Sequence, residues 1–102
     1  MSYMELTSKQ RAYLRGEAQT IDPIVMIGKE GLTDNVKSAL DDALFHHELV
    51  KVKFQQYKDD VREIAFKCAE LTTSVLVATT GFTAVFYRQK EKSEERIYQL
   101  PR

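Results

Sequence analysis

The most informative stretch of the sequence reads Pro23-Ile24-Val25-Met26-Ile27-Gly28-Lys29-Glu30-Gly31-Leu32-Thr33. Its four apolar residues, 24–27, are rich in β-branched side chains and lie between a proline and a glycine, which predicts a short buried strand. The two glycines that follow favour a tight turn, and Thr33 is placed to cap a helix. The stretch therefore predicts a strand that turns sharply into the N-terminus of a helix.

Hydrophobic periodicity extends this pattern in both directions. Upstream, Thr7 and Gln10 form a Thr-x-x-Gln capping box that starts a helix, which Pro23 prevents from continuing. The predicted helices cover 8–19, 34–46 and 60–71, and the predicted strands cover 24–27, 50–55, 73–79 and 83–88. The last helix is expected to bury Val61, Ile64, Ala65, Cys68 and Leu71. The order helix, strand, helix, strand, helix, strand, strand predicts an α+β domain with helices packed on a mixed sheet.

The length of the chain limits it to one unit. A sequence of 102 residues with 43% hydrophobic residues has room for one core, so residues 1–102 are expected to form a single domain. Residues 89–96 are highly charged and are expected to be flexible. The longest apolar run is far too short for a membrane span, and Met1-Ser2-Tyr3 does not resemble a signal peptide. Together with the lone Cys68, these features predict a cytoplasmic protein.

Charge is balanced overall but uneven along the chain. Fifteen basic residues match fifteen acidic ones, which gives no support to a simple basic nucleic-acid binder. Between Glu30 and Glu48, however, five acids oppose the single Lys37, for a local net charge of −4, so the remainder carries +4. A neutral total can thus hide one acidic and one basic face, although both can equally be ordinary solvated surface.

The glycine turn is the main candidate for chemistry. A helix N-terminus attracts anions through its unpaired amides and its dipole, glycines allow a close approach, and Lys29 adds a positive charge. The alternative is a purely structural turn, and four residues alone do not exclude it. The segment lacks the pattern of a P-loop, whereas KH domains use a Gly-x-x-Gly loop to hold a nucleic-acid backbone.

No other group of residues predicts catalysis or a metal site. Adjacent His46 and His47 point in different directions at a helix end and lack a cysteine partner, and their position is explained by the helix dipole. Cys68 lies on an apolar stripe and is expected to be a core residue. No serine or threonine belongs to a nucleophile and base pattern. We therefore expect a protein that is not an enzyme and needs no metal, cofactor or small-molecule substrate.

Taken together, several motifs resemble the CRM-domain family, named for chloroplast RNA splicing and ribosome maturation, and in particular its bacterial single-domain YhbY-like members. The motifs, in order, are 6–11 (Leu-Thr-Ser-Lys-Gln-Arg), Leu14-Arg15, Pro23, 27–33 (Ile-Gly-Lys-Glu-Gly-Leu-Thr), 47–52 (His-Glu-Leu-Val-Lys-Val) and 100–102 (Leu-Pro-Arg). The resemblance covers nearly the whole chain. It implies a two-layer α/β sandwich like the C-terminal domain of translation initiation factor three, in which helices cover one face of a four-stranded mixed sheet.

The resemblance also implies a function and a site. It implies an RNA-binding protein associated with assembly of the large ribosomal subunit, which contacts structured ribosomal RNA or its precursor particle. The residues implied to meet RNA are Lys9, Arg11 and Arg15 of the first helix, the loop residues Gly28, Lys29, Glu30 and Gly31, and Arg88. Phe82, after the glycine of the last hairpin, replaces a basic residue of other members and could stack on a base. Lys51 and Lys53 are best explained as solubilising residues, and a monomer is favoured.

A second function remains open. The outward side of the second helix carries Asp34, Asp41 and Asp42, which could bind a basic ribosomal protein. In that case the chain would be a protein-interaction adaptor.

Overall fold

The computed structural model describes residues 5–102, and the Met1-Ser2-Tyr3 start considered above lies outside this range. The helices are α1 (Ser8–Ala18), α2 (Asp34–His47), α3 (Val61–Thr72) and the short 3₁₀ helix η1 (Ser93–Glu95). The strands are β1 (Val25–Ile27), β2 (Leu49–Phe54), β3 (Val75–Thr80) and β4 (Thr83–Tyr87). The predicted order of elements and the mixed four-stranded sheet are confirmed.

The strands lie in the order β1-β2-β4-β3. β1 runs parallel to β2, while β4 is antiparallel to both β2 and β3. Ile27 lies beside Phe54, and Thr83 lies beside Lys53. The loop after β1, the loop after β2 and the β3–β4 hairpin therefore meet at one end of the sheet, which we call the loop end.

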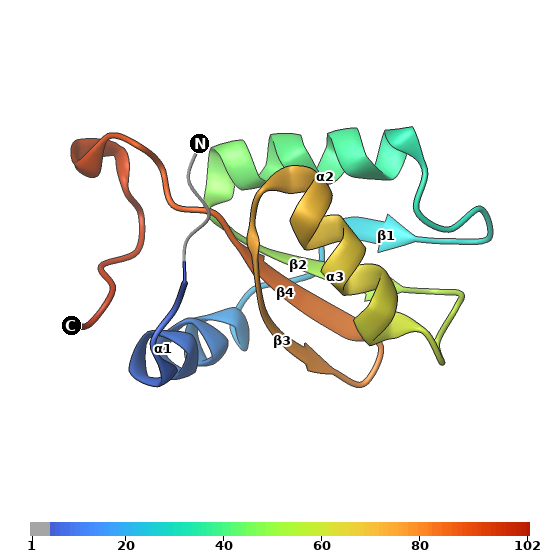
Figure 1. Ribbon diagram of the computed structural model, residues 1–102, viewed down its shortest axis with the longest axis horizontal. Coiled ribbons are helices and arrows are strands. Elements are labelled where there is room, and N and C mark those ends of the chain that lie inside the picture. Colours follow the sequence, from blue (N-terminus) through green and yellow to red (C-terminus); the bar gives the residue numbers. More distant parts are fainter. Residues whose placement is uncertain (1–4) are drawn as a thin grey trace.

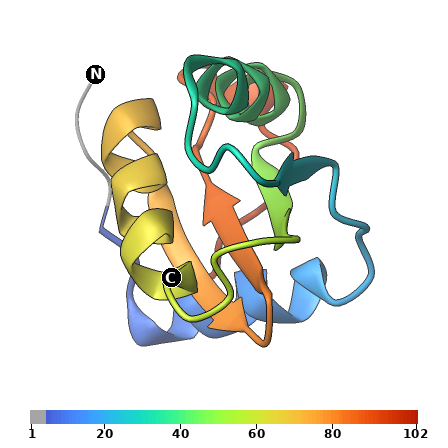
Figure 2. The same ribbon diagram turned by 90° about the vertical axis from the view of Figure 1, so that its right-hand side faces the viewer.

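Helices cover both faces of this sheet. α2 and α3 pack on one face over a core that includes Leu40, Leu44 and Phe86. α1 packs on the other face, where Leu14 and Ala18 contact a second cluster around Leu49, Val77, Val85 and Tyr87. Figure 1 and Figure 2 show α1 on the side of the sheet opposite α2 and α3. The expectation of helices on one face, and of two layers, is therefore wrong. The physical reason is that β4 is apolar on both sides, so both of its faces need a cover.

The inward face of α3 differs by one position from the prediction. Leu71 is half exposed, and Thr72 turns inward instead. The Thr72 hydroxyl donates to the Cys68 carbonyl oxygen at 2.8 Å and lies 2.7 Å from the Ser74 hydroxyl, so its polar group is satisfied in the core. Cys68 is buried as expected, and burial raises the pKa of its thiol to about 11.

The C-terminal segment is attached to the domain by one buried carboxylate. Glu48 is fully buried between α2 and β2, and its two oxygens accept the backbone N–H groups of Lys90, Ile97 and Tyr98 at 2.8–3.1 Å. The Arg96 side chain donates to the Lys90 carbonyl oxygen at 2.8 Å. Most of the segment 89–96 thus lies between two anchored points, and its flexibility stays a prediction.

Candidate nucleic-acid interface

The glycine loop is held in shape by its own backbone and by one aromatic ring. The Gly31 N–H donates to the Gly28 carbonyl oxygen at 3.0 Å, which closes the turn. Tyr57, from the loop after β2, donates its hydroxyl to the Lys29 carbonyl oxygen at 2.8 Å. Its ring also covers Gly31, which is buried and has φ +72°. The turn is therefore formed before any ligand arrives.

The outer side of this loop presents free backbone donors. Lys29 and Glu30 are exposed, and their amides make no hydrogen bond to any residue in 5–102. At the start of α2, the Thr33 hydroxyl accepts the Val36 amide at 3.2 Å, while Asp34 and Asn35 keep amides without a partner among the described residues. Such donors, together with the positive end of the helix dipole, suit an anion.

Charges of both signs surround these donors. The Lys29 ammonium forms no salt bridge within the described chain, so it is available to an anion. Glu30 follows Lys29 directly in the sequence. Asp34 lies in the first turn of α2, where its carboxylate already interacts favourably with the helix dipole. The loop is therefore a moderate rather than a strong anion site.

Two further side chains lie at the loop end. Phe82, at the tip of the β3–β4 hairpin, is half exposed, and the Lys58 ammonium lies 4.7 Å from the centre of its ring. Tyr57 is half exposed as well. Exposed aromatic faces beside free lysines can stack on nucleic-acid bases. Phe82 was apparent as a candidate from the sequence, whereas Tyr57 and Lys58 were not. The signal for them is an aromatic residue followed by a lysine in a polar loop after a strand.

The residues predicted from α1 lie elsewhere. α1 packs across β2, β4 and β3 on the face of the sheet opposite α2. Figure 1 shows α1 and the loop between β1 and α2 at opposite ends of the molecule, so the basic residues of α1 do not join the glycine loop in one patch. Arg11 is engaged within the protein, because its guanidinium donates to the carbonyl oxygens of Leu76 at 2.7 Å and Val77 at 2.8 Å. Lys9 and Arg15 are exposed.

Arg88 lies just after the end of β4, at the end of the sheet opposite the loop. Tyr87 pairs with Leu49 at the start of β2, and Thr83 pairs with Lys53 near its end. Arg88 is five residues along the strand from Thr83, so it lies about 17 Å from the loop end. The Arg88 guanidinium binds the Asp41 carboxylate and also donates to the Thr72 carbonyl oxygen at 2.8 Å. Arg88 therefore joins α2 to α3, and the geometry gives it a structural role.

These contacts leave fewer free carboxylates on the outward side of α2. The Asp41 carboxylate is paired with Arg88, and the Asp42 carboxylate lies 3.5 Å from the His46 ring. Glu48, counted among the five acids of this region, is buried. An adaptor that uses Asp34, Asp41 and Asp42 would therefore have to compete with contacts inside the protein.

The described residues form neither a metal-binding cluster nor a helix that could cross a membrane. Residues 5–102 contain no group of three or more His, Cys, Asp or Glu side chains positioned to hold a metal ion. In the same range, no helix has the length and hydropathy needed to cross a membrane.

Comparison with known proteins identifies the family. The model of the CRS1/YhbY (CRM) domain matches residues 6–88. The chain belongs to the CRM-domain family. It is 38% identical over 98 residues to an RNA-binding protein of Haemophilus influenzae, covering 95% of this chain and 96% of that protein. It is also 37% identical over 97 residues to the probable RNA-binding protein YqeI of Bacillus subtilis, covering 94% of this chain and 99% of the relative.

A solved structure supports the same assignment for the fold. The solution structure of a hypothetical protein from Staphylococcus aureus matches this CRM domain with a TM-score of 0.80 and 42% sequence identity. The match covers 95% of this chain and 100% of that one. The resemblance read from the sequence motifs is thereby confirmed.

Proposed function

We propose that this CRM domain binds structured RNA through its loop end. In this proposal a phosphate of the RNA backbone accepts hydrogen bonds from the free amides of Lys29 and Glu30 and from those of Asp34 and Asn35 at the α2 N-terminus. Lys29 supplies charge, and Tyr57 and Phe82 offer aromatic faces. The relatives in Haemophilus influenzae and Bacillus subtilis are named as RNA-binding proteins, which supports RNA as the partner.

The observation that carries this proposal is that the glycine loop is held in a fixed shape while its outward donors stay unpaired. Its backbone is fixed by the Gly31–Gly28 hydrogen bond and by Tyr57, yet its outward amides and the Lys29 ammonium have no partner in residues 5–102. A rigid loop with unused donors binds an anion without first losing conformational entropy. Loops that hold their shape in this way suit recognition of an RNA backbone by its form rather than its sequence.

We propose further that the RNA belongs to the large ribosomal subunit or its precursor, that the protein acts in the cytoplasm during assembly, and that it binds without catalysing a reaction. The motif resemblance to single-domain YhbY-like proteins supports this part. The neutral net charge of the chain fits a protein that makes few phosphate contacts, so its RNA binding should be of modest strength and only weakly dependent on salt.

A charge reversal tests the loop. Titration of a ribosomal RNA fragment with Lys29→Glu should show weaker binding and a salt dependence flatter by about one to two counterions than for the wild type. Lys92→Glu makes the same charge change at an exposed position outside the loop and should bind as the wild type does. Equal affinity of Lys29→Glu and wild type would contradict the proposal. Binding lost only in an Asp41→Lys, Asp42→Lys variant, and only toward ribosomal proteins, would favour the adaptor.

Sedimentation tests the ribosomal part. The protein should co-sediment with large-subunit particles or their precursors in a low-salt gradient, and Lys29→Glu should shift to the top of the gradient. Absence of the wild type from every subunit fraction would contradict the assembly role while leaving RNA binding itself to the titration.

A further inference from the structure

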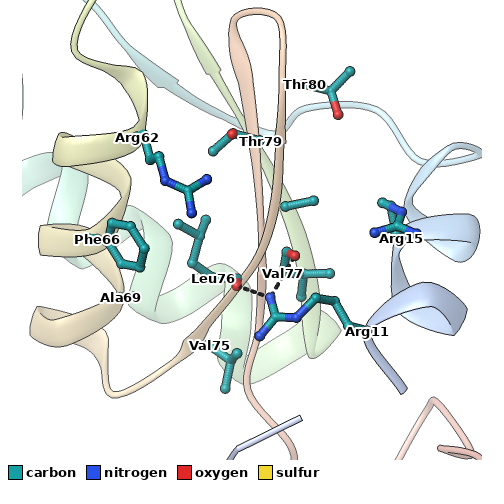
Figure 3. A pocket seen from close by; sticks show the side chains of 11 residues that line it. Arg11, Arg15, Arg62, Phe66, Ala69, Val75, Leu76, Val77, Thr79 and Thr80 are labelled. Atoms are coloured by element: carbon teal, nitrogen blue, oxygen red, sulfur yellow. Dashed lines mark hydrogen bonds between the residues drawn. The ribbon is translucent and has the colours of Figure 1, made fainter. Parts of the chain in front are cut away.

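A second basic site lies along the outer edge of β3, away from the glycine loop. A groove of about 490 Å³ runs between α1 and α3 over this strand. Figure 3 shows Arg62 and Phe66 entering it from α3, Arg11 and Arg15 from the side of α1, and the β3 residues between them. The groove was not apparent from the sequence, because α1 and α3 belong to opposite faces of the sheet and meet only at this edge.

The groove is strongly positive in a chain that is neutral overall. Three guanidinium groups, those of Arg11, Arg15 and Arg62, line it, and no carboxylate does. Neither Arg15 nor Arg62 takes part in a salt bridge within residues 5–102. Since fifteen acidic residues are available in the chain, a groove lined by arginines alone favours an anionic ligand.

The edge of β3 is closed to a peptide strand. An exposed edge normally offers free carbonyl and amide groups to an added strand. Here one nitrogen of Arg11 binds the carbonyl oxygens of both Leu76 and Val77, at the point where the register between β3 and β4 shifts. Because a bulge and a capping arginine both interrupt strand addition, an acidic peptide bound as an extra strand fits poorly.

Phe66 adds an aromatic face to the charges. Its side chain is half exposed, and the Arg62 guanidinium lies 5.2 Å from the centre of its ring. Alternation of a cationic group and an aromatic face is the pattern with which proteins hold single-stranded nucleic acid, where phosphates and bases alternate. The volume is that of a small-ligand site, which suits nucleotides of a single strand.

We propose that this groove binds single-stranded RNA, with phosphates on Arg15 and Arg62 and a base against Phe66. The inference rests on the proposed function, because it takes RNA as the partner. It extends that function to a second contact at the opposite edge of the sheet. Three strand spacings, about 14 Å, separate β3 at this edge from β1, so the two contacts are distinct. An RNA with a folded part at the loop end and an unpaired extension would reach both sites.

Two RNAs and matched variants test this proposal. Fluorescence anisotropy compares a blunt hairpin with the same hairpin carrying an unpaired extension of about eight nucleotides. The wild type should bind the extended hairpin at least about tenfold more tightly, and Arg15→Ala, Arg62→Ala should lose that gain while keeping its affinity for the blunt hairpin. Phe66→Ala should lose part of the gain. Lys67→Ala, also exposed on α3, and Phe45→Ala, exposed on α2, lie outside the groove and should keep the gain.

The outcomes separate this proposal from the proposed function. A wild type that binds the blunt hairpin through Lys29 but gains nothing from the extension would overturn the groove and leave the loop intact. An unchanged gain in the Arg15→Ala, Arg62→Ala variant, or an equal loss on both hairpins, would also overturn it. The groove proposal would also be overturned if a poly-glutamate peptide bound in a way that depends on Arg15 and Arg62 while binding of the extended hairpin did not depend on them. A wild type that binds neither hairpin would overturn both proposals.

Discussion

The two glycines of the turn are present for different reasons. Gly31 has φ +72°, and a Cβ there would lie 3.3 Å from the Tyr57 ring, so both backbone and packing require glycine. At Gly28 a Cβ would lie 3.8 Å from its nearest neighbour, the Gln55 side chain, and its φ lies outside the left-handed region. Nothing among residues 5–102 demands glycine at position 28. Under the proposed function, the reason for this glycine is the close approach of a phosphate.

Alanine substitutions separate the two roles. Gly31→Ala should lower the free energy of unfolding by about 1–2 kcal/mol, because the left-handed backbone and the Tyr57 contact are both strained. Gly28→Ala should change it by less than about 0.5 kcal/mol and yet weaken RNA binding, because the new methyl group stands on the side that a phosphate must approach. Urea denaturation and RNA titration measure the two effects. A Gly28→Ala protein with full RNA affinity would show that no ligand approaches this residue.

Glu48 is the residue whose importance the sequence conceals. In the sequence, Glu48 is one of five acids in the stretch 30–48. In the structure it is fully buried and accepts hydrogen bonds from three backbone N–H groups. Glu48→Gln should cost about 2 kcal/mol of stability, because an amide NH₂ cannot accept the hydrogen bonds that a carboxylate oxygen accepts. Hydrogen exchange at Lys90, Ile97 and Tyr98 should accelerate at the same time. The exposed Glu91→Gln is the control, and equal stability of both variants would refute this role.

At the scale of elements, local signals were sufficient for the order of helices and strands. The Thr7–Gln10 capping box forms at the start of α1, with both of its hydrogen bonds at 3.1 Å, and Thr33 caps α2 as predicted. These features depend on neighbours within four residues, which the sequence displays directly. The face to which α1 packs depends on how β2, β4 and β3 pair, and a helical stripe such as Leu14 and Ala18 fits either side of a sheet equally well.

Arg11 attaches α1 to the edge strand β3. Arg11→Ala should lower stability by about 1–2 kcal/mol, because the Leu76 and Val77 carbonyl oxygens lose a charged donor at a strand edge. Arg15→Ala, one turn later and exposed, should leave the free energy of unfolding within about 0.5 kcal/mol of the wild type. Chemical denaturation measures the free energy of unfolding of both variants and shows whether the Arg11 side chain stabilises the fold. Equal stability of the two would contradict the structural role.

At the scale of the whole molecule, the site was only partly foreseeable. Lys29 and Glu30 lie exposed in the turn just before the N-terminus of α2, as the flanking glycines and Thr33 indicate. Residues that meet through tertiary pairing could not be foreseen: Arg88 joins Asp41 across 47 positions, and Tyr57 reaches Lys29 across 28. Of the basic residues that the resemblance implies as RNA contacts, Arg11 and Arg88 also hold the domain together through such pairings.

The buried core predicts how the whole domain responds to alkali. Burial, with the nearby Glu48 charge, raises the pKa of Tyr87 to about 12 from an ordinary 10, and burial raises that of Cys68 to about 11 from 9. Both groups stay neutral in the folded state after the unfolded chain has ionised. Stability should therefore be unaffected by these groups below about pH 9 and fall between about pH 9 and 12, with Tyr87 contributing about 2 kcal/mol.

A single substitution checks this alkaline loss. The Tyr87 hydroxyl is buried without a hydrogen-bond partner in the described chain, and the nearby Gln89 side chain only partly offsets the rise in its pKa. Tyr87→Phe should therefore leave stability at neutral pH equal or slightly higher and flatten the loss above about pH 10. Denaturation curves across this range provide the measurement, and parallel losses in wild type and variant would contradict it.

The proposed function places the backbone of folded RNA on the turn between β1 and α2. Backbone amide chemical shifts of the isotope-labelled protein, followed as a blunt RNA hairpin is added, test this contact. We expect the largest changes at Gly28, Lys29 and Glu30 and at the first amides of α2, Asp34 and Asn35. Changes confined to the outward face of α2 around Asp42, with the loop amides unmoved, would contradict it.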